Sequence, residues 1–303
     1  MAVQTDSGPL LGAADSGIIV PPHAMVVQNL DKLVQSARAA ALHITTSVGT
    51  VVAAIRETDS IGKPGVWLPA AQQPATTQML TGLPAATGTR VLYISVPGAA
   101  AARVKITAVT PRGSYQPTGG TGISLLGHLT TGISLPSLSG LSGSIEVSAN
   151  VPVTAVLEAS GGPAGAPGAF ISGSAPITEQ GVVAGSPAGA AGSTEIVLSA
   201  PGKAASVRIT NAAPGSTLAG QPGQVVQIKA KSATIVRLKL PKHSASASLM
   251  SVVVTPQAGS GPVYAAMLAV SGGTVRNVLP IGSSPTRIVL PDVRQSLVGV
   301  LGS

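Results

Sequence analysis

The sequence has no cysteine, which excludes disulfide bonds, thiolate zinc sites and a cysteine nucleophile. Charged residues make up only 9% of the 303 residues, whereas an ordinary soluble domain carries about 25%. Aromatic residues make up 2%, and they are Trp67, Tyr93, Tyr115, Phe170 and Tyr264. So few aromatics cannot form a platform of stacked rings for sugars or single-stranded nucleic acid. The core therefore has to consist of Val, Ile, Leu and Ala.

The residues that are abundant favour strands over helices. Hydrophobic residues make up 44% of the chain, which is too apolar for an ordinary disordered protein. The 37 glycines and 25 prolines disfavour a helical bundle, because both residue types destabilise helix interiors. Short alternating segments such as Val236–Leu240 place apolar and polar side chains on opposite faces of a strand. The composition and the alternation together predict an all-β fold.

Three segment types recur along the chain. The first is a strand that occurs at Thr50–Arg56, Pro152–Glu158 and Pro262–Leu268. The second is a Ser-x-Pro-Gly turn that leads into the strands Arg103–Thr107 and Val207–Thr210. The third is a strand followed by a turn and a second strand, at Gly17–Val27, Gly122–Ile133 and Val225–Val236. This pattern predicts tandem immunoglobulin-like β-sandwich repeats of about 105 residues. The expected units are residues 1–88, an incomplete first repeat with its join, residues 89–192, and residues 193–303, a basic third repeat with a C-terminal strand.

The two ends of the chain raise separate expectations. The first 17 residues lack the basic and apolar regions of a signal peptide, and no segment reads as a membrane span. The chain is therefore either cytoplasmic or begins after a targeting segment, and the incomplete first repeat favours the second alternative. The tail Thr274–Leu301 contains the strand-like Arg287–Leu290. Because unpaired edges are a liability, we expect this tail to pair with a neighbouring sheet, the first repeat being one candidate.

A search for catalytic patterns finds no enzyme signature. Neither a G-x-S-x-G elbow nor an H-E-x-x-H zinc motif occurs. His23 and His128 fall at equivalent repeat positions, where a turn histidine is the favoured interpretation. Glu146 and Glu158 lie on two predicted adjacent strands and could face each other, although exposed strand charges are the better interpretation. The sequence therefore predicts no catalytic, cofactor-binding or metal-binding residues and no nucleic-acid partner.

Two aromatic residues are candidate contact residues. Trp67 lies two residues before Pro69 in the join between the first two predicted repeats, and Phe170 is its expected equivalent in the next join. We expect each to plug a join between neighbouring sandwiches. The alternative is that they anchor a protein partner.

The last third of the chain is basic. Between Glu195 and Asp292 there are nine Lys and Arg residues and no acid. Lys229 and Lys231 are expected to share a face of one strand, and Arg237 and Lys239 a face of the next. If these two strands pair, the four cations lie close together, with Lys242 just beyond. Such a cluster is either a solvated edge that prevents aggregation or a contact for an anionic lipid, a wall polymer or an acidic protein surface.

Several short motifs resemble a family of uncharacterised actinobacterial envelope proteins, known as a domain of unknown function. The motifs are Trp67–Pro69, Gly82–Val91, Val96–Gly98, Pro152–Ala155 and Ile288–Arg294. The resemblance implies an extracytoplasmic protein behind an N-terminal membrane anchor that is not in this chain, associated with membrane glycosyltransferases that build envelope polysaccharide. We therefore expect a non-catalytic scaffold or accessory subunit that binds an envelope membrane protein. The rival expectation is a module that binds an anionic lipid or polymer through the basic third repeat.

Overall fold

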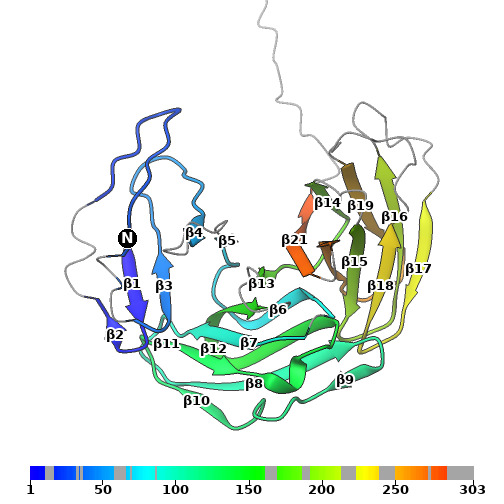
Figure 1. Ribbon diagram of the computed structural model, residues 1–303, viewed down its shortest axis with the longest axis horizontal. Helices are drawn as coiled ribbons and strands as arrows, with labels where there is room; N and C mark the ends of the chain where they lie inside the picture. Colours follow the sequence, from blue (N-terminus) through cyan, green and yellow to red (C-terminus); the bar gives the residue numbers. More distant parts are fainter. Residues whose placement is uncertain are drawn as a thin grey trace, which may run out of the picture.

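The computed structural model describes residues 1–10, 17–31, 34, 37–57, 66–68, 70–85, 87–160, 169–185, 192–212, 223–238, 250–271 and 274–284. The prediction of an all-β fold is confirmed: in these residues, the one helical element is the three-residue 3-10 helix η1 (Pro136–Leu138). The strands form two eight-stranded sheets and two small N-terminal sheets, arranged as a U (Figure 1).

One strand organises the middle unit. β12 (Gly143–Ala159) pairs through its first half with β6 (Ala75–Leu83) and β8 (Ala102–Thr110), and through its second half with β7 (Arg90–Ser95) and β13 (Ala169–Ser174). β13 also pairs with β6, so the sheet folds back on itself into a nearly closed barrel. The outer strands are β9 (Gly113–Tyr115), β10 (Ile123–Leu125) and β11 (Thr130–Ser134).

The third unit uses the same pairing scheme with different strands. Its sheet runs in the order β17-β16-β19-β14-β21-β20-β15-β18. The strands are β14 (Gln180–Gly185), β15 (Gly192–Ala200), β16 (Ala205–Ala212), β17 (Gln224–Ile228), β18 (Ser232–Leu238), β19 (Met250–Pro256), β20 (Tyr264–Ser271) and β21 (Thr274–Ser284). β19 and β20 take the places of the two halves of β12, since β19 pairs with β16 and β14 whereas β20 pairs with β15 and β21.

The N-terminal unit contains part of this scheme. β1 (Ala2–Thr5) pairs with β2 (Gly8–Pro9) and β3 (Ala40–His43), while β4 (Ile55–Glu57) pairs with β5 (Val66–Leu68). The β1–β2 turn matches the β8–β9 turn: the Thr5 hydroxyl donates to the Gly8 carbonyl at 2.8 Å, and the Thr110 hydroxyl donates to the Gly113 carbonyl at 2.9 Å. β1 and β3 therefore correspond to β8 and the first half of β12.

A backbone feature recurs in all three units. His23, His128 and Lys231 have φ values of 58°, 59° and 55°, which lie in the left-handed region that non-glycine residues rarely adopt. Each occupies the same place in the strand-turn-strand segment that recurs in the sequence. The turn requires a positive φ at this place, so the backbone geometry is retained while the side chain differs.

Strand pairing runs across both predicted domain boundaries. β6 lies before residue 88 but pairs with β12, and β14 lies before residue 192 but pairs with β19 and β21. The division into three domains itself stays a prediction. Of the expected tail, residues 274–284 form β21 and pair with β20 and β14. Arg287–Leu290 lies outside the described residues.

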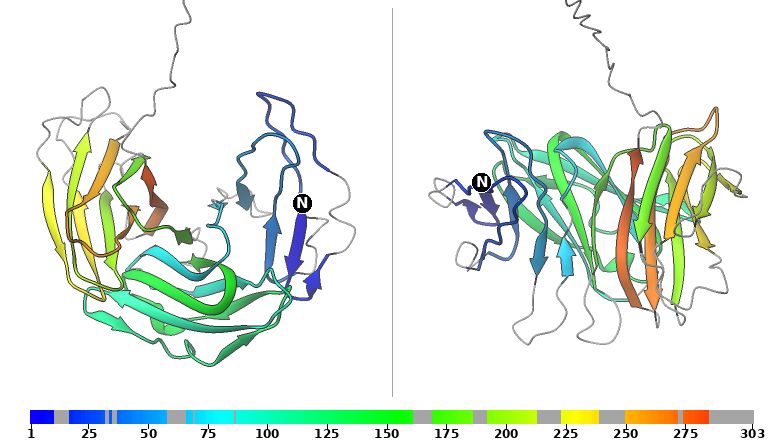
Figure 2. Two further views of the ribbon diagram at one scale, coloured as in Figure 1. Left: turned by 180° about the vertical axis from the view of Figure 1, so that it is seen from behind. Right: turned by 90° about the horizontal axis from the view of Figure 1, so that it is seen from above.

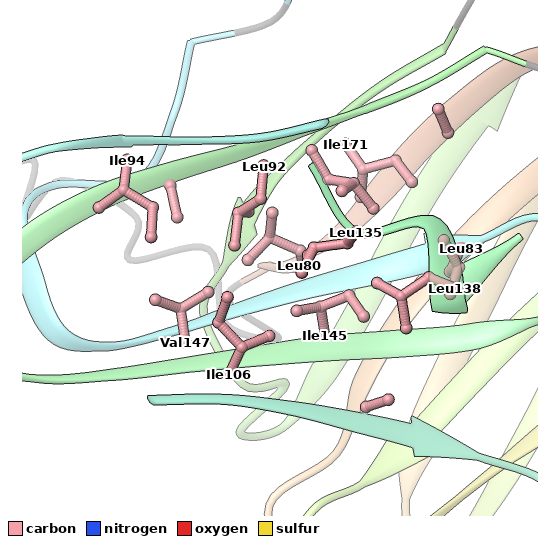
Figure 3. Packing of buried hydrophobic residues seen from close by; sticks show 14 of the residues in the cluster. Leu80, Leu83, Leu92, Ile94, Ile106, Leu135, Leu138, Ile145, Val147 and Ile171 are labelled. Carbon is pink, nitrogen blue, oxygen red and sulfur yellow. The ribbon is translucent and has the colours of Figure 1, made fainter. Parts of the chain in front are cut away.

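The middle unit has an aliphatic core between its two sheet layers. Leu80, Leu92, Ile106 and Ile145 have no exposed surface and point toward one another (Figure 3). Complete burial of a side chain of this size contributes about 1.5–3 kcal/mol. The core thus depends on many Leu, Ile and Val contacts, as the low aromatic content predicts.

The third unit packs against the middle unit through a sheet that is apolar on both faces. In β20, Ala265 and Met267 face the third unit's own core, whereas Ala266 and Leu268 join the core of the middle unit. Gly82 of β6 makes this close approach possible: a Cβ there would lie 2.7 Å from Val278 and 3.0 Å from Ala266. The two units therefore form one packed block.

We predict that Gly82→Ala destabilises the protein by about 1–3 kcal/mol, because the added methyl group overlaps Val278 and the φ of +108° is unfavourable for alanine. Chemical denaturation of the two proteins measures the difference. The matched control is Gly98→Ala, at an exposed turn position where a Cβ meets nothing within 4 Å. Equal losses in the two variants would contradict the packing role of Gly82.

Candidate functional site

The most distinctive surface is the outer face of the sheet formed by β11, β7, the second half of β12, and β13. We call it the aromatic face; it comprises Val91, Tyr93, Val156, Glu158 and Phe170. Residues that alternate with these, such as Leu92 and Leu157, are buried in the core, so the aromatic face points away from it. All five side chains are only half-buried. The strands that carry this face lie at the base of the U (Figure 2), and β13 lies against β5.

Tyr93 and Glu158 form the central polar contact of the aromatic face. The Tyr93 hydroxyl donates to Glu158 Oε2 at 2.9 Å. Partial burial, this hydrogen bond and the nearby charges of Glu158 and Glu57 raise the pKa of Tyr93 from 10 to about 12. A phenol with this pKa remains protonated at neutral pH, so the pair acts as a fixed donor and acceptor and not as a base.

The N-terminal unit reaches one end of the aromatic face. The Ser95 hydroxyl donates to Gln4 Oε1 at 2.8 Å, and the Thr130 hydroxyl donates to the Gln4 carbonyl at 3.1 Å. The corresponding contact between the middle and third units joins the hydroxyls of Ser144 and Ser199 at 2.5 Å. The aromatic face of the middle unit is thus equivalent to the surface through which the third unit contacts the middle unit.

Trp67 does not plug a join, contrary to expectation. Its side chain lies on β5 and is 62% exposed, with the Arg56 guanidinium 5.9 Å from the centre of its ring. Among the described residues, β5 pairs with β4 alone, and each of the two strands has three residues. Phe170, its expected equivalent, is half-buried on the aromatic face. Trp67 and Phe170 also have equivalent partners in the neighbouring strand. Arg56 of β4 lies opposite Trp67 of β5, and Glu158 of β12 lies opposite Phe170 of β13.

The predicted cluster of cations on two paired strands is also wrong in its geometry. β17 ends at Ile228, so Lys229 and Lys231 lie in the turn before β18. β17 pairs with β16 and β18 pairs with β15, which puts the two strands in opposite layers. Arg237 lies further along β18 and forms an ion pair with Glu195 at 3.0 Å. Lys239 and Lys242 lie outside the described residues.

Other candidates from the sequence do not come together. Glu146 and Glu158 are not on adjacent strands, since both belong to β12, which continues through the register shift between Ser148 and Val153. The two predicted strands are therefore one strand with an irregular segment between Ser148 and Val153. Among the described residues, no group of three or more His, Asp or Glu side chains could hold a metal ion. No helix in the described part of the chain is long and apolar enough to cross a membrane.

One important residue had not been singled out from the sequence. Arg90 has no exposed surface, and its guanidinium donates to the carbonyl oxygens of Thr89, Ser160 and Pro84. These bonds close the connection from β6 to β7 and tie it to the end of β12. Gly82 and Arg90 both belong to the motif Gly82–Val91 that carries the family resemblance. Two residues of that motif therefore have structural roles.

We predict a pH-dependent loss of stability that depends on Tyr93. Because its pKa rises from 10 in the unfolded chain to about 12 in the fold, the stabilisation is complete below pH 10 and is lost as the pH rises toward 12. Denaturation curves across this range measure the loss, which Tyr93→Phe should reduce. Tyr115→Phe is the control, since burial alone raises the pKa of Tyr115. Identical pH profiles for the wild type and Tyr93→Phe would contradict the assignment.

Comparison with known proteins identifies the family. No curated protein sequence matches the chain. The family of unknown function DUF5719 matches residues 1–239, which is most of the chain. The chain therefore belongs to this family of unknown function.

Proposed function

We propose that the protein is a non-catalytic extracytoplasmic scaffold of tandem immunoglobulin-like sandwiches, an accessory subunit of cell-envelope assembly. Its partner is a membrane protein, such as an envelope glycosyltransferase. The membrane attachment lies in a segment outside this chain. The support for the envelope setting is the resemblance of the sequence motifs. The support for binding is the exposed pair Arg56 and Trp67.

The same strand-pair position serves as a contact in another unit. In the third unit, Leu268 faces Val278 across β20 and β21, and both pack against Gly82 of the middle unit. In the middle unit, Glu158 and Phe170 occupy the position and are half-buried. In the N-terminal unit, Arg56 and Trp67 occupy it and are exposed. A position that contacts a neighbouring sheet elsewhere in the chain is available here for another protein.

The residue types support this interpretation. Trp and Arg are the residues most enriched among those that dominate binding energy at protein interfaces. Arg56 stacked beside the indole keeps both side chains oriented with little loss of entropy on binding. Burial of such a pair gives a compact anchor for a partner surface.

We expect a photoreactive amino acid at position 67 to cross-link a multi-spanning membrane protein in native membranes. Position 126 is the control, because Leu126 is exposed to a similar extent, 66%, on a turn of the middle unit. Trp67→Ala should weaken capture of the same protein by roughly tenfold or more, the effect of a truncated anchor residue. Failure to enrich any membrane protein at position 67 over position 126 would refute the proposal.

A second function is favoured by one observation. Lys203, Lys229 and Lys231 are exposed in two turns at the same end of the third unit. The turns are neighbours because Ala200 pairs with Ser232 and Ala205 pairs with Ile228. Three cations at one end of a sandwich can bind anionic headgroups or an anionic polymer.

Sedimentation with anionic and neutral vesicles tests the second function. At about 1 kcal/mol per cation, replacing the three lysines by glutamine should remove roughly 3 kcal/mol of binding, and salt should weaken the binding of the wild type. Replacement of Arg103 and Lys105 on β8 and of Arg112 in the turn after it, all three exposed, is a charge-matched control on another surface. Equal sedimentation with both vesicle types would dismiss lipid binding and leave the protein-scaffold proposal standing.

A further inference from the structure

The N-terminal unit has two open strand edges within the described part of the chain. In the middle unit, β6 lies between the first half of β12 and β13 and pairs with both. In the third unit, β14 lies between β19 and β21 in the same way. The equivalent neighbours in the N-terminal unit are β3 and β5. Among the described residues, β3 pairs only with β1 and β5 pairs only with β4, so no described strand lies between them.

A strand position in the other layer of the N-terminal unit is open as well. β7 pairs with β11 and with the second half of β12, and β15 pairs with β18 and β20. In the N-terminal unit, β4 corresponds to the second half of β12, and residues 25–29 correspond to β11 because His23 and His128 occupy equivalent places. In the part of the chain that the structure describes, β4 pairs only with β5, and residues 25–29 pair with no strand. Each of the other two units fills both positions with two consecutive strands, β6 and β7 or β14 and β15.

The middle unit shows what covers the apolar residues beside these positions. Three aliphatic residues of the N-terminal unit are 41%, 45% and 43% exposed, whereas their equivalents in the middle unit are at most 6% exposed: Val20 and Leu125, Ile44 and Val147, and Val51 and Val153. In the middle unit these positions belong to one core with Leu80 of β6 and Leu92 of β7. The two consecutive strands therefore supply the side chains that bury such residues. An exposed apolar surface with this equivalence is typical of a binding site.

The position between β3 and β5 also adjoins an interface that the chain already forms. In the contact between the two larger units, Gly82 of β6 lies against Ala266 of the third unit. The aromatic face is equivalent to that third-unit surface, and Gln4 of β1 accepts a hydrogen bond from Ser95 at its end. A strand between β3 and β5 would thus have the apolar residues of the N-terminal unit on one face and the aromatic face on the other. Such a strand must be apolar on both faces, and an acid beside Glu158 would be unfavourable.

A second copy of this chain has no free described strands of this kind. Its β6 and β7, and its β14 and β15, are each paired with two neighbours in their own unit. Leu80, Leu92, Ile196 and Leu198 on three of these strands have no exposed surface, so moving the strands to another molecule would open a core. A different protein is therefore the occupant that fits.

We propose that the N-terminal unit binds a segment of a partner protein as two consecutive strands, one between β3 and β5 and the next alongside β4. The segment is apolar at alternate positions, because those side chains cover Val20, Ile44 and Val51. Main-chain hydrogen bonds to the open edges supply affinity, and the alternate side chains supply selectivity. This site is separate from the Arg56–Trp67 pair, so the proposal goes beyond the proposed function and the two can fail independently.

Hydrogen exchange of the full chain with a synthetic peptide tests the site. The probe has the sequence of residues 75–95, which form β6 and β7 in the middle unit. At saturation it should slow exchange of the β3 amides that do not donate to β1 by roughly tenfold or more, because these amides then gain a partner. The control peptide carries Leu80→Asp and Leu92→Asp, which place acids on the core-facing side. Equal exchange with the two peptides would overturn the proposal.

Two neighbouring valines of the chain provide matched variants. Val51 occupies the place of the buried Val153, whereas Val52 is fully exposed and occupies the place of Thr154. Val51→Asp should weaken binding of the probe by roughly tenfold or more, because the complex buries the new charge. Val52→Asp should change it by no more than about twofold. Both side chains are exposed in the free chain, so both variants should fold, and equal effects on binding would contradict the site.

A photoreactive amino acid at position 44 identifies the source of the bound segment. In native membranes we expect cross-links to another protein, mapped by mass spectrometry to a segment that is apolar at alternate positions. The 75–95 peptide should compete with these cross-links, and the Asp-containing control peptide should not. Cross-links to this same chain, or β3 amides already protected in the purified full chain, would show that the position is filled without a partner and would refute binding in trans.

Discussion

The arrangement of the molecule depends on one sheet that is buried on both sides. β20 and β15 use alternate residues for two different cores, so that Met267 packs within the third unit while Leu268 packs against the middle unit. This requires apolar residues at consecutive positions, which a half-exposed strand does not have. It also requires the facing strand to come close, and Gly82 permits that approach. The orientation of the two larger units follows from this contact.

The same position in each unit has been given a different chemical character. Leu268 and Val278 make an apolar contact, Glu158 and Phe170 mix charge with an aromatic ring, and Arg56 and Trp67 pair a cation with an indole. The backbone pairing is constant through this series. A repeated fold thus uses one register position for internal packing in one unit and leaves it half-buried or exposed in the other two. This supports a binding role for the N-terminal half of the protein.

The sequence predicts the strands well where alternation or β-branched runs are strong, as in Arg103–Thr107 and Val207–Thr210. It fails where a residue's local preference differs from its tertiary context. Glu146 and Glu158 are predicted on two separate strands, but the chain continues as one irregular strand because β6 pairs with the first half of β12 and β7 with the second. Lys229 and Lys231 alternate like strand residues, yet the left-handed backbone at Lys231 requires a turn. The Tyr93–Glu158 contact depends on strand register between distant segments, which composition and spacing do not reveal.

The unbroken β12 has a consequence for cooperativity. Because one strand of 17 residues belongs to both layers of the middle unit, neither layer can separate without breaking the pairing of the other. The middle unit should therefore unfold as a single cooperative block. In the third unit, the same two positions belong to β19 and β20, which are joined by a connection that contains Gly259 and Gly261. Its layers are linked by β14, which pairs with both β19 and β21, by packing and by that connection, but by no strand that runs through both among the described residues. Partial opening should therefore cost less there, and the protein has a built-in gradient of local stability along its length.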